Sequence, residues 1–345
     1  MKEQGMGGFF IHSRDGLETV YMGQEWMNLV RSTVETAEQL GMQTWLYDED
    51  RWPSGFAGGL VQERGGDAFR AKGLTLEVLH PSRSNDVSDA KGIQDAVALF
   101  KAVVAERELI QCERLDAFAA GVTWKDGEVL LVFRVEVSES SAWFNYEAPP
   151  DHLNPDTVQA FIDITYEAYK REVGQHFGKT IRGVFTDEPS IHDRHCKFTE
   201  GRGWIPWSWS FPAYFQERRG YDLLDIVPYM FFNGELSSAA RHDYWRTVTE
   251  RFSESYSKQI GEWCGNNSLA FTGHYLWENN LGTATRVCGA VMPNYRYQHV
   301  PGIDMLNEQT NEYITVKQCT SVAESIRQKV RPHRNLRLHG LGLHV

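Results

Sequence analysis

Five short apolar runs along the chain each end in a group of polar or charged residues. They cover residues 8–11, 44–47, 183–186, 269–273 and 298–303. Both faces of a parallel strand are covered in a folded protein, so the middle of such a strand is apolar and only its carboxyl end holds charge. A strand that stops at a solvated acidic turn would give the same local pattern. Its recurrence favours buried parallel strands whose polar ends converge.

Helical patterns lie between these runs. Apolar residues recur at helical spacing over residues 24–40, and Gly41 follows where a left-handed cap is expected. A second helix is predicted to begin at Asn154, with Pro155 in its first turn, and a third covers residues 241–266. The alternation of strands and helices predicts an α/β fold with a parallel sheet.

Residues 68–140 depart from this alternation. Two apolar runs, at 74–79 and 129–137, predict strands, and residues 125–127 (Lys-Asp-Gly) predict a turn between them. Residues 95–107 have a helical pattern. We expect a small β-rich subdomain inserted after the strand at 44–47.

Composition excludes several classes of function. The chain has 345 residues, 41% of them hydrophobic, and a formal net charge of −11. A surface of this sign repels nucleic acid and anionic membranes, and no basic patch is evident before residue 325. The five cysteines show neither close pairs nor metal-type spacing, so we expect them to be reduced. No signal peptide or bilayer-spanning run is recognisable, which predicts a cytoplasmic protein if residue 1 is its true start.

Acidic strand ends and eleven tryptophans favour a carbohydrate cleft. Carboxyl groups perform acid–base chemistry at a glycosidic oxygen, and flat aromatic side chains pack on the apolar faces of sugar rings. Trp26 and Trp263 lie on helical stripes and are predicted to be core. The tryptophans in loop or strand-end contexts are candidates for binding: Trp52, Trp204, Trp207, Trp209 and Trp277.

The acidic triplet at residues 48–50 has two interpretations. Asp48, Glu49 and Asp50 could bind sugar hydroxyls or a hard cation such as calcium, which takes several oxygen ligands. Alternatively, Arg14 and Arg51 neutralise the triplet in a structural network of ion pairs. The sequence leaves both interpretations open.

Three motifs resemble bacterial glycoside hydrolases related to the family 106 α-L-rhamnosidases. They are residues 7–14 (GGFFIHSR), 45–55 (WLYDEDRWPSG) and 185–189 (FTDEP). Residues 143–145 (WFN) and 273–275 (GHY) extend the resemblance over most of the chain. It implies a (β/α)8 TIM-type barrel, hydrolysis of an α-linked deoxyhexose or a related sugar, and calcium as a possible component of the site.

Glu188 is the predicted general acid, which protonates the leaving oxygen. Glycoside hydrolysis needs a second carboxyl group, and Glu278 and Asp304 are the candidates. The residues expected to bind the sugar lie at or near the ends of the predicted strands: His12, Arg14, Asp48, Glu49, Asp50, Arg51, Trp52, Asn145, Asp187, His274, Tyr275 and Trp277.

Both ends of the chain depart from the resemblance. Residues 1–5 resemble the last turn of a helix that follows a first barrel strand, which makes the strand at 44–47 the third. Residues 325–345 hold five basic residues, three histidines and no acid. Back-translation of residues 332–344 in a frame shifted by one nucleotide permits a strand containing Thr-Glu-Thr-Tyr-Gly, so we interpret this tail as the product of a frameshift. The expected barrel is therefore incomplete.

Two other functions compete with glycoside hydrolysis. The first is an inactive fragment or non-catalytic carbohydrate-binding remnant, which the expected loss of strands favours. The second is a metal-dependent hydrolase of another kind, for which His192 and His195 form the nearest cluster of ligands. That cluster is more typical of a loop that follows the catalytic strand.

Overall fold

A parallel sheet of five strands forms the centre of the fold. The computed structural model describes residues 1–14, 16–81, 93, 95–116, 122–192, 195–305 and 313–330. The strands of this sheet follow one another in chain order, with each strand parallel to its neighbours. They are β1 (Gly8–Ile11), β2 (Gln43–Tyr47), β7 (Ile181–Thr186), β9 (Ala270–Gly273) and β10 (Val300–Pro301). The predicted α/β fold with a parallel sheet is thus confirmed.

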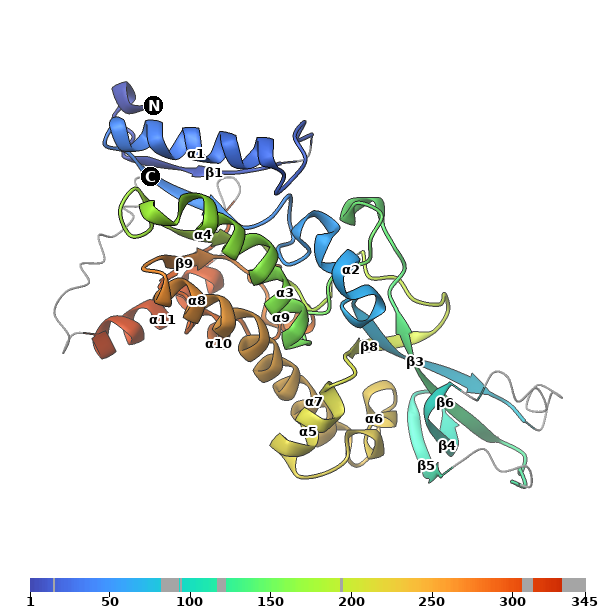
Figure 1. The fold of residues 1–345 in the computed structure, drawn as a ribbon. Helices are drawn as coiled ribbons and strands as arrows, with labels where there is room; N and C mark the ends of the chain where they lie inside the picture. Colours follow the sequence, from blue (N-terminus) through green and yellow to red (C-terminus); the bar gives the residue numbers. More distant parts are fainter. Residues whose placement is uncertain are drawn as a thin grey trace.

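Helices connect these strands (Figure 1). The predicted helix at 24–40 is α1 (Gln24–Gln39), and Gly41 follows it with a φ of 61°. Asn154 caps α3 (Pro155–Phe161) by accepting the N–H of Asp156, and a π-helical turn at 162–166 continues α3 into α4 (Glu167–Val173).

The long helix that was predicted at 241–266 begins slightly earlier. It consists of α7 (Ser237–Phe252), a π-helical segment at 253–258 and α8 (Gln259–Asn266). Its predicted apolar stripe lies in the core, because Tyr244, Phe252 and Tyr256 are fully buried. The remaining helices near the sheet are α9 (Leu281–Cys288), α10 (Val291–Tyr295) and α11 (Ile314–Val330).

The parallel sheet is open rather than closed. Among the described residues, no strand pairs with the outer edge of β1 or of β10, so these residues do not by themselves close the eight-stranded barrel implied by the resemblance. The sheet carries aromatic side chains that are not fully covered: Phe10 is 43% exposed and lies against the rings of Trp45 and Phe185. Close strand packing also explains Gly183, because a Cβ there would lie 2.3 Å from the carbonyl oxygen of Ala270 and 2.4 Å from the ring of Trp45.

A second, antiparallel sheet projects from the helical region (Figure 1). Its order is β5-β4-β6-β3-β8, and its strands are β3 (Lys72–Leu79), β4 (Ala96–Ala105), β5 (Glu108–Leu115), β6 (Glu128–Val137) and β8 (Gly203–Trp207). The helix predicted at 95–107 is wrong, because this segment is β4. Its alanines suit a helix, but β4 pairs with β5 and β6 along its two edges, and this tertiary pairing overrides the local propensity.

Strand β8 lies outside the segment that was predicted to be β-rich. It comes from the chain after β7 and pairs antiparallel with β3, so Trp204 and Trp207 belong to a strand and not to a loop. One hydrophobic cluster includes residues from both sheets, such as Leu74 and Phe133 of the antiparallel sheet and Val184 and Phe271 of the parallel one.

Both ends of the described part of the chain are helical. Lys2–Gln4 forms a single 3-10 turn, and Gly5 follows it in a left-handed conformation. Residues up to 330 belong to α11, whereas residues 331–345, which hold the proposed frameshift, lie outside the described residues. None of the helices in the described segments is both long enough and apolar enough to cross a bilayer.

Candidate functional site

A cavity of about 420 Å3 lies at the carboxyl ends of the parallel strands. It brings together residues that are far apart in the sequence and that were predicted from strand ends. Its lining is Phe10, His12, Arg14, Trp52, Phe185, Asp187, Glu188, His274, Ile303 and Asp304. Segments following β1, β2, β7, β9 and β10 therefore all contribute to one site.

Asp187 and His274 form an ion pair in this cavity. The carboxylate of Asp187 lies 2.7 Å from Nε2 of His274 through Oδ1 and accepts the hydroxyl of Tyr47 at 2.7 Å through Oδ2. Burial alone would raise the pKa of Asp187, but these hydrogen bonds and the charge of His274 hold it below its usual value. Burial alone would lower the pKa of His274, yet the bond to Asp187 and nearby carboxylates raise it to about 9. His274 is therefore an imidazolium at neutral pH.

Glu188 faces this imidazolium together with Asp304. One oxygen of Glu188, one oxygen of Asp304 and one ring nitrogen of His274 all lie within 4.8 Å of one another. Glu188 has a φ of 49°, a left-handed conformation that non-glycine residues rarely adopt. The strand end thus directs an acidic side chain into the cavity with an unusual backbone turn.

Glu278, the other candidate for the second carboxyl group, has a different environment. It is 4% exposed and is not among the residues that line the cavity. It accepts the hydroxyl of Tyr295, the N–H of Tyr275 at 3.3 Å and the N–H of Asp304 at 3.0 Å. Burial raises the pKa of Glu278, and the charge of His274 opposes this rise. Its hydrogen bonds hold the backbone of Asp304 in place beside the cavity.

The three acids of the triplet after β2 lie in three different environments. Asp48 is fully buried, accepts the hydroxyls of Ser54 and Tyr166 at 2.6 Å each, and has its pKa raised by burial to about 7. Asp50 forms an ion pair with Arg51 at 3.4 Å. None of the three acids lines the cavity.

Glu49 is enclosed by its own loop. Its two carboxylate oxygens accept five backbone N–H groups at 2.8–2.9 Å, from Asp50, Gly55, Phe56, Ala57 and Gly58. Burial raises the pKa of Glu49 to about 8, and the backbone donors oppose this rise because they stabilise the charged form of the carboxylate. The loop that carries Trp52 is therefore wrapped around a buried carboxyl group.

Ser54 joins the ends of β2 and β7 and was not anticipated from the sequence. Its hydroxyl donates to Asp48 at 2.6 Å and accepts the N–H of Asp187 at 2.8 Å, and its own N–H donates to the carbonyl of Asp187 at 2.7 Å. The only available signal was its place in the polar segment after residue 47. Ser54 fixes the position of Asp187, and hence that of Glu188, relative to β2.

Three further predicted binding residues, Arg51, Asn145 and Tyr275, also lie outside the cavity. Asn145 donates to Asp50 at 3.1 Å and to the carbonyl of Gly58 at 2.9 Å, and it accepts from Arg51 at 3.0 Å. Tyr275 is fully buried, with its hydroxyl 2.8 Å from that of Ser257. Asn145 thus bonds to Arg51 and to other residues of the loop after β2, and Tyr275 belongs to the core.

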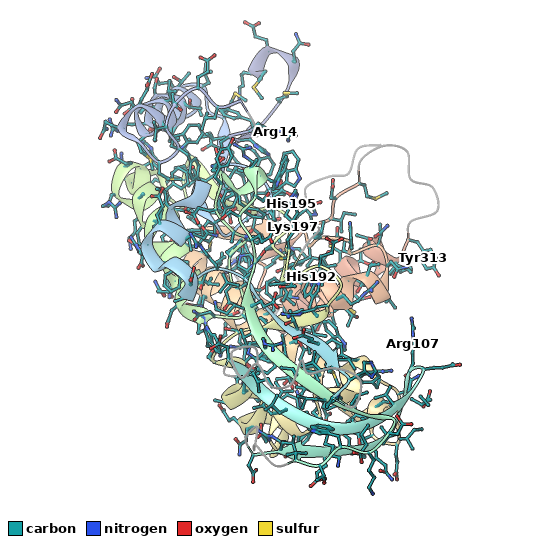
Figure 2. All side chains as sticks on the ribbon, turned by 90° about the vertical axis from the view of Figure 1, so that its right-hand side faces the viewer. Arg14, Arg107, His192, His195, Lys197 and Tyr313 are labelled. Carbon is teal, nitrogen blue, oxygen red and sulfur yellow. The ribbon has the colours of Figure 1, made fainter. Side chains whose placement is uncertain are left out.

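A second cavity of about 230 Å3 adjoins the first, because Trp52 and Glu188 line both. Its other lining residues are Pro53, Trp143, His195, Leu276 and Trp277. Arg14 of the first cavity and His195 of the second lie on the same face of the molecule (Figure 2). Trp204, Trp207 and Trp209 line neither cavity.

The calcium implied by the resemblance would need more ligands than the acidic cluster of this cavity supplies. Calcium takes about six to eight oxygen ligands, water included, and the group formed by Glu188, His274 and Asp304 offers two carboxylates and an imidazole. Nε2 of His274 is hydrogen-bonded to Asp187.

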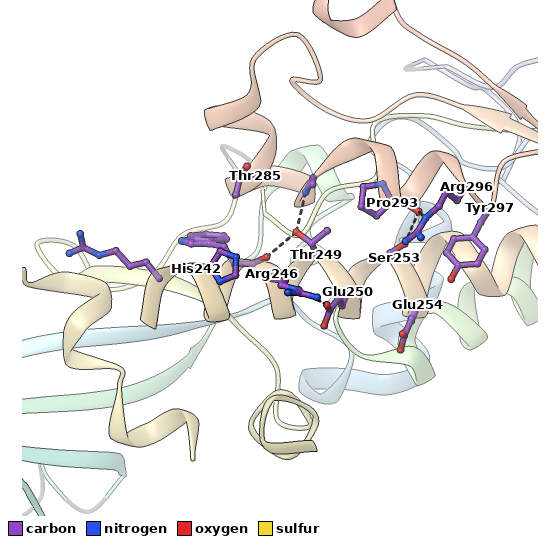
Figure 3. Close-up of a pocket in the computed structure, with 13 residues that line it drawn as sticks. His242, Arg246, Thr249, Glu250, Ser253, Glu254, Thr285, Pro293, Arg296 and Tyr297 are labelled. Carbon is purple, nitrogen blue, oxygen red and sulfur yellow. Dashed lines mark hydrogen bonds and ion pairs between the residues drawn. The ribbon is translucent and has the colours of Figure 1, made fainter. Parts of the chain in front are cut away.

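Another cavity, of about 610 Å3, lies along α7, α9 and α10 (Figure 3). Its two carboxylates are paired with arginines: Glu250 with Arg219 and Glu254 with Arg218 at 2.8 Å. The hydroxyls of Thr249 and Ser253 donate to backbone carbonyls at 2.9 and 3.1 Å (Figure 3). Because both of its carboxylates are neutralised by arginines, we take the cavity at the strand ends as the candidate site.

Comparison with known proteins finds similarity in fold. No family model matches the chain. The structure of a rhamnosidase from Novosphingobium sp. PP1Y is similar over 94% of this chain and 48% of its own, with a TM-score of 0.57 and 13% identity. A protein of Formosa agariphila, named as a candidate β-glucuronidase, is 21% identical over 131 residues, which are 37% of this chain and 10% of that protein. The chain thus spans about half of the rhamnosidase structure.

Proposed function

We propose that this chain is a glycoside hydrolase that cleaves the O-glycosidic bond of an α-linked deoxyhexose. The observation that carries the proposal is the pair of carboxyl groups, Glu188 and Asp304, that face one cavity at the ends of parallel strands. Sites at this end of parallel strands are the usual place for catalysis in sheets of this kind. The similarity in fold to a protein named as a rhamnosidase supports it.

Glu188 is the general acid in this proposal. It donates a proton to the glycosidic oxygen while the bond from that oxygen to the anomeric carbon breaks and its electron pair stays on the oxygen. The carboxylate of Asp304 stabilises the positive charge that develops at the anomeric carbon. The oxygen of a water molecule then bonds to this carbon, the water loses a proton to solvent, and Glu188 is reprotonated from solvent.

His274 holds the two carboxyl groups in place. Its imidazolium lies beside Glu188 and Asp304 and is fixed by Asp187, whose position Ser54 and Tyr47 secure in turn. A cation at this point lowers the repulsion between the two acids. We therefore assign Asp187 and His274 as positioning residues.

The side chains that line the cavity favour a deoxyhexose as the substrate. Its wall includes three apolar side chains, Phe10, Phe185 and Ile303, on which the methyl group of a 6-deoxy sugar can pack. His12 and Asp187, with the carboxyl groups, provide partners for hydroxyls. Arg14 also lines the cavity and would suit a sugar carboxylate, so a uronic acid is the alternative substrate.

We extend the proposal to the fold. The sequential order of the five parallel strands is that of a singly wound sheet, which is the order found in (β/α)8 barrels. Exposed Phe10 would then face the barrel interior. We assign residues 68–140 as a subdomain inserted into this barrel.

Carbohydrate binding without turnover is the second candidate function. The nearest oxygens of Glu188 and Asp304 lie within 4.8 Å, whereas working pairs are about 5–5.5 Å apart for retention and about 6.5–9.5 Å for inversion. This spacing leaves too little room for the water molecule of an inverting mechanism, so a site in which Asp304 is not a nucleophile would bind a sugar without cleaving it.

Release of p-nitrophenol from p-nitrophenyl α-L-rhamnoside by the complete chain tests the proposal. We expect turnover of this substrate by wild type, and a fall of at least about 100-fold in Glu188→Gln on the methyl α-L-rhamnoside, whose leaving oxygen needs a proton. The fall on the p-nitrophenyl glycoside should be smaller, because p-nitrophenolate leaves without being protonated. Asp304→Asn should lose activity, Glu278→Gln should lose stability more than activity, and Glu200→Gln, at an exposed acid, is the control.

Three outcomes separate the candidates. Turnover of a p-nitrophenyl glucuronide but not of the rhamnoside supports glycoside hydrolysis and contradicts a deoxyhexose as the substrate. Saturable binding of rhamnose by calorimetry without turnover supports the binding function. A folded chain that neither binds nor cleaves either sugar contradicts both functions.

A further inference from the structure

Glu188 stands at the boundary between two cavities. It lines the cavity of about 420 Å3 and the adjoining cavity of about 230 Å3, and Trp52 is the one other residue common to the two described linings. A general acid acts on the oxygen that joins the two parts of a glycoside. If Glu188 acts there, one part of the substrate lies in each cavity. This step rests on the proposed function.

Both cavities combine polar and apolar side chains. The larger one holds hydrogen-bonding side chains such as Asp187, His274 and Asp304, which suit the hydroxyl groups of a sugar, beside the apolar Phe10, Phe185 and Ile303. Apart from Glu188 and His195, the smaller one is lined by aromatic or aliphatic side chains: Trp52, Pro53, Trp143, Leu276 and Trp277. A ring that has an apolar face and polar groups at its edge therefore suits the smaller cavity.

The three tryptophans of the smaller cavity are not equivalent. The ring of Trp52 faces the guanidinium of Arg14 at 5.0 Å. Trp143 stacks on His195 with 5.5 Å between ring centroids and 4° between planes, and its indole N–H donates to the carbonyl of Trp52 at 2.8 Å. These two rings already have partners within the protein.

Trp277 differs from these two tryptophans because its ring is exposed. It is 49% exposed, and in the part of the chain that the structure describes its ring contacts no other aromatic ring and no cation. Its φ of 55° is left-handed, as is the φ of 49° at Glu188. Bulky residues rarely adopt this conformation, and it persists mainly where a side chain must be aimed. Two such residues line the same small cavity.

We propose that the cavity lined by Trp143, His195, Leu276 and Trp277 receives the leaving group of the glycoside, and that it takes a flat six-membered ring packed on Trp277. Its volume of about 230 Å3 is sufficient, since a cavity of about 150 Å3 can hold benzene. An aromatic aglycone and a pyranose both present a flat ring with an apolar face. The larger cavity then holds the sugar whose anomeric bond is cleaved.

The test compares three glycosides of one sugar: the methyl glycoside, the p-nitrophenyl glycoside and a disaccharide. In Trp277→Ala we expect kcat/KM for ring-bearing substrates to fall about 3- to 10-fold, the scale of one aromatic contact, and that for the methyl glycoside to change less than about twofold. Trp209→Ala, at a 61% exposed tryptophan outside both cavities, is the control and should change none of them. If kcat/KM falls for the aryl glycoside alone, the smaller cavity binds an aromatic aglycone. If it falls for the disaccharide as well, the cavity binds either an aromatic ring or a pyranose ring. An equal loss on all three substrates, or no loss, overturns the proposal.

A binding measurement separates this inference from the proposed reaction. Calorimetry with Glu188→Gln measures Kd for the same three glycosides, with and without Trp277→Ala and Trp277→Phe. If wild type cleaves none of them, the proposed hydrolysis is wrong. The ring site is still supported if ring-bearing glycosides bind more tightly than the methyl glycoside, if Trp277→Ala abolishes this difference in Kd, and if Trp277→Phe keeps part of it. Ring-bearing and methyl glycosides binding equally well contradicts the ring site.

Discussion

Nε2 of His274 and Oδ1 of Asp187 lie 2.7 Å apart at the ends of neighbouring strands. The pair joins β7 to β9 and carries a buried charge to within 4.8 Å of Glu188 and Asp304. Its effects on pH dependence and on stability can be measured without knowing the substrate.

The pair should make stability depend on pH in a defined direction. The pKa of His274 is raised from 6.5 to about 9, so its contribution is complete below pH 6.5 and is lost as the pH rises through 9. The pKa of Asp187 is lowered, so its contribution is present above its usual value of 3.8 and is lost at lower pH. Both contributions are complete between about pH 4 and 6.5.

Urea unfolding of wild type and His274→Gln measures this contribution. At about 1.4 kcal/mol per pKa unit, the difference in unfolding free energy should be larger at pH 6 than at pH 9.5 by on the order of 3 kcal/mol. His242→Gln, at an exposed histidine, is the control. In Asp187→Asn the pKa of His274, measured by NMR, should fall by at least about one unit. A difference that does not vary with pH would exclude a buried imidazolium.

Replacement of the carboxyl group of Glu49 by an amide should destabilise the loop that carries Trp52. Five backbone N–H groups donate to this carboxylate, and the amide of Glu49→Gln leaves some of them facing an NH2 group. Hydrogen bonds to charged groups contribute about 1.5–3 kcal/mol each, and we expect a loss of roughly 2–4 kcal/mol in urea unfolding. Glu63→Gln, at an exposed acid of α2 (Leu60–Gly65), should change stability by less than about 0.5 kcal/mol. Equal stability of the two variants would contradict the structural role of Glu49.

The positions of the catalytic candidates could be predicted from local pattern. A parallel strand has an apolar middle and a polar end whatever its neighbours are, so His12, Asp187 and His274 could be placed at strand ends, and the strand order brings those ends together. The helices at 24–40 and 241–266 could be predicted for the same reason, since their periodicity is local.

The fate of the acidic triplet could not be predicted in this way. Asp48 and Glu49 follow a strand as Asp187 and Glu188 do, yet the loop after them folds back and supplies Ser54 and five N–H groups. That fold-back depends on contacts with β7 that no local pattern contains. The choice between Glu278 and Asp304 depended likewise on Tyr295, whose hydroxyl holds Glu278 away from the cavity.

Strand β4 shows the opposite failure, in which a local signal is misleading. Residues 95–107 contain alanines at helical spacing, but pairing with β5 and β6 decides their conformation. Strand β8 could not be recognised because its partner, β3, is more than a hundred residues away in the sequence. Pairing over such distances carries no sequence period of its own.

The antiparallel sheet is joined to the rest of the fold by a buried ion pair. Nζ of Lys72 in β3 lies 3.3 Å from Oδ2 of Asp151, and both side chains are almost completely inaccessible. The same ammonium donates to the carbonyls of Ala68 and Arg70 at 3.1 and 2.7 Å. Removal of one member of such a pair leaves an uncompensated buried charge, which typically costs about 3–5 kcal/mol.

Lys72→Met should therefore lower the unfolding free energy by about 3–5 kcal/mol at pH 7. The double variant Lys72→Met with Asp151→Leu should recover much of this loss, because two apolar groups replace the ion pair. Burial already raises the pKa of Asp151, and without Lys72 it rises further. Protonation then removes the unpaired charge, so the penalty of the single variant should be smaller at pH 5 than at pH 7. Lys101→Met, which removes the partly exposed pair with Glu128, should cost less than about 1 kcal/mol. If the single and double variants are equally unstable at both pH values, the attachment of this sheet depends on apolar packing alone.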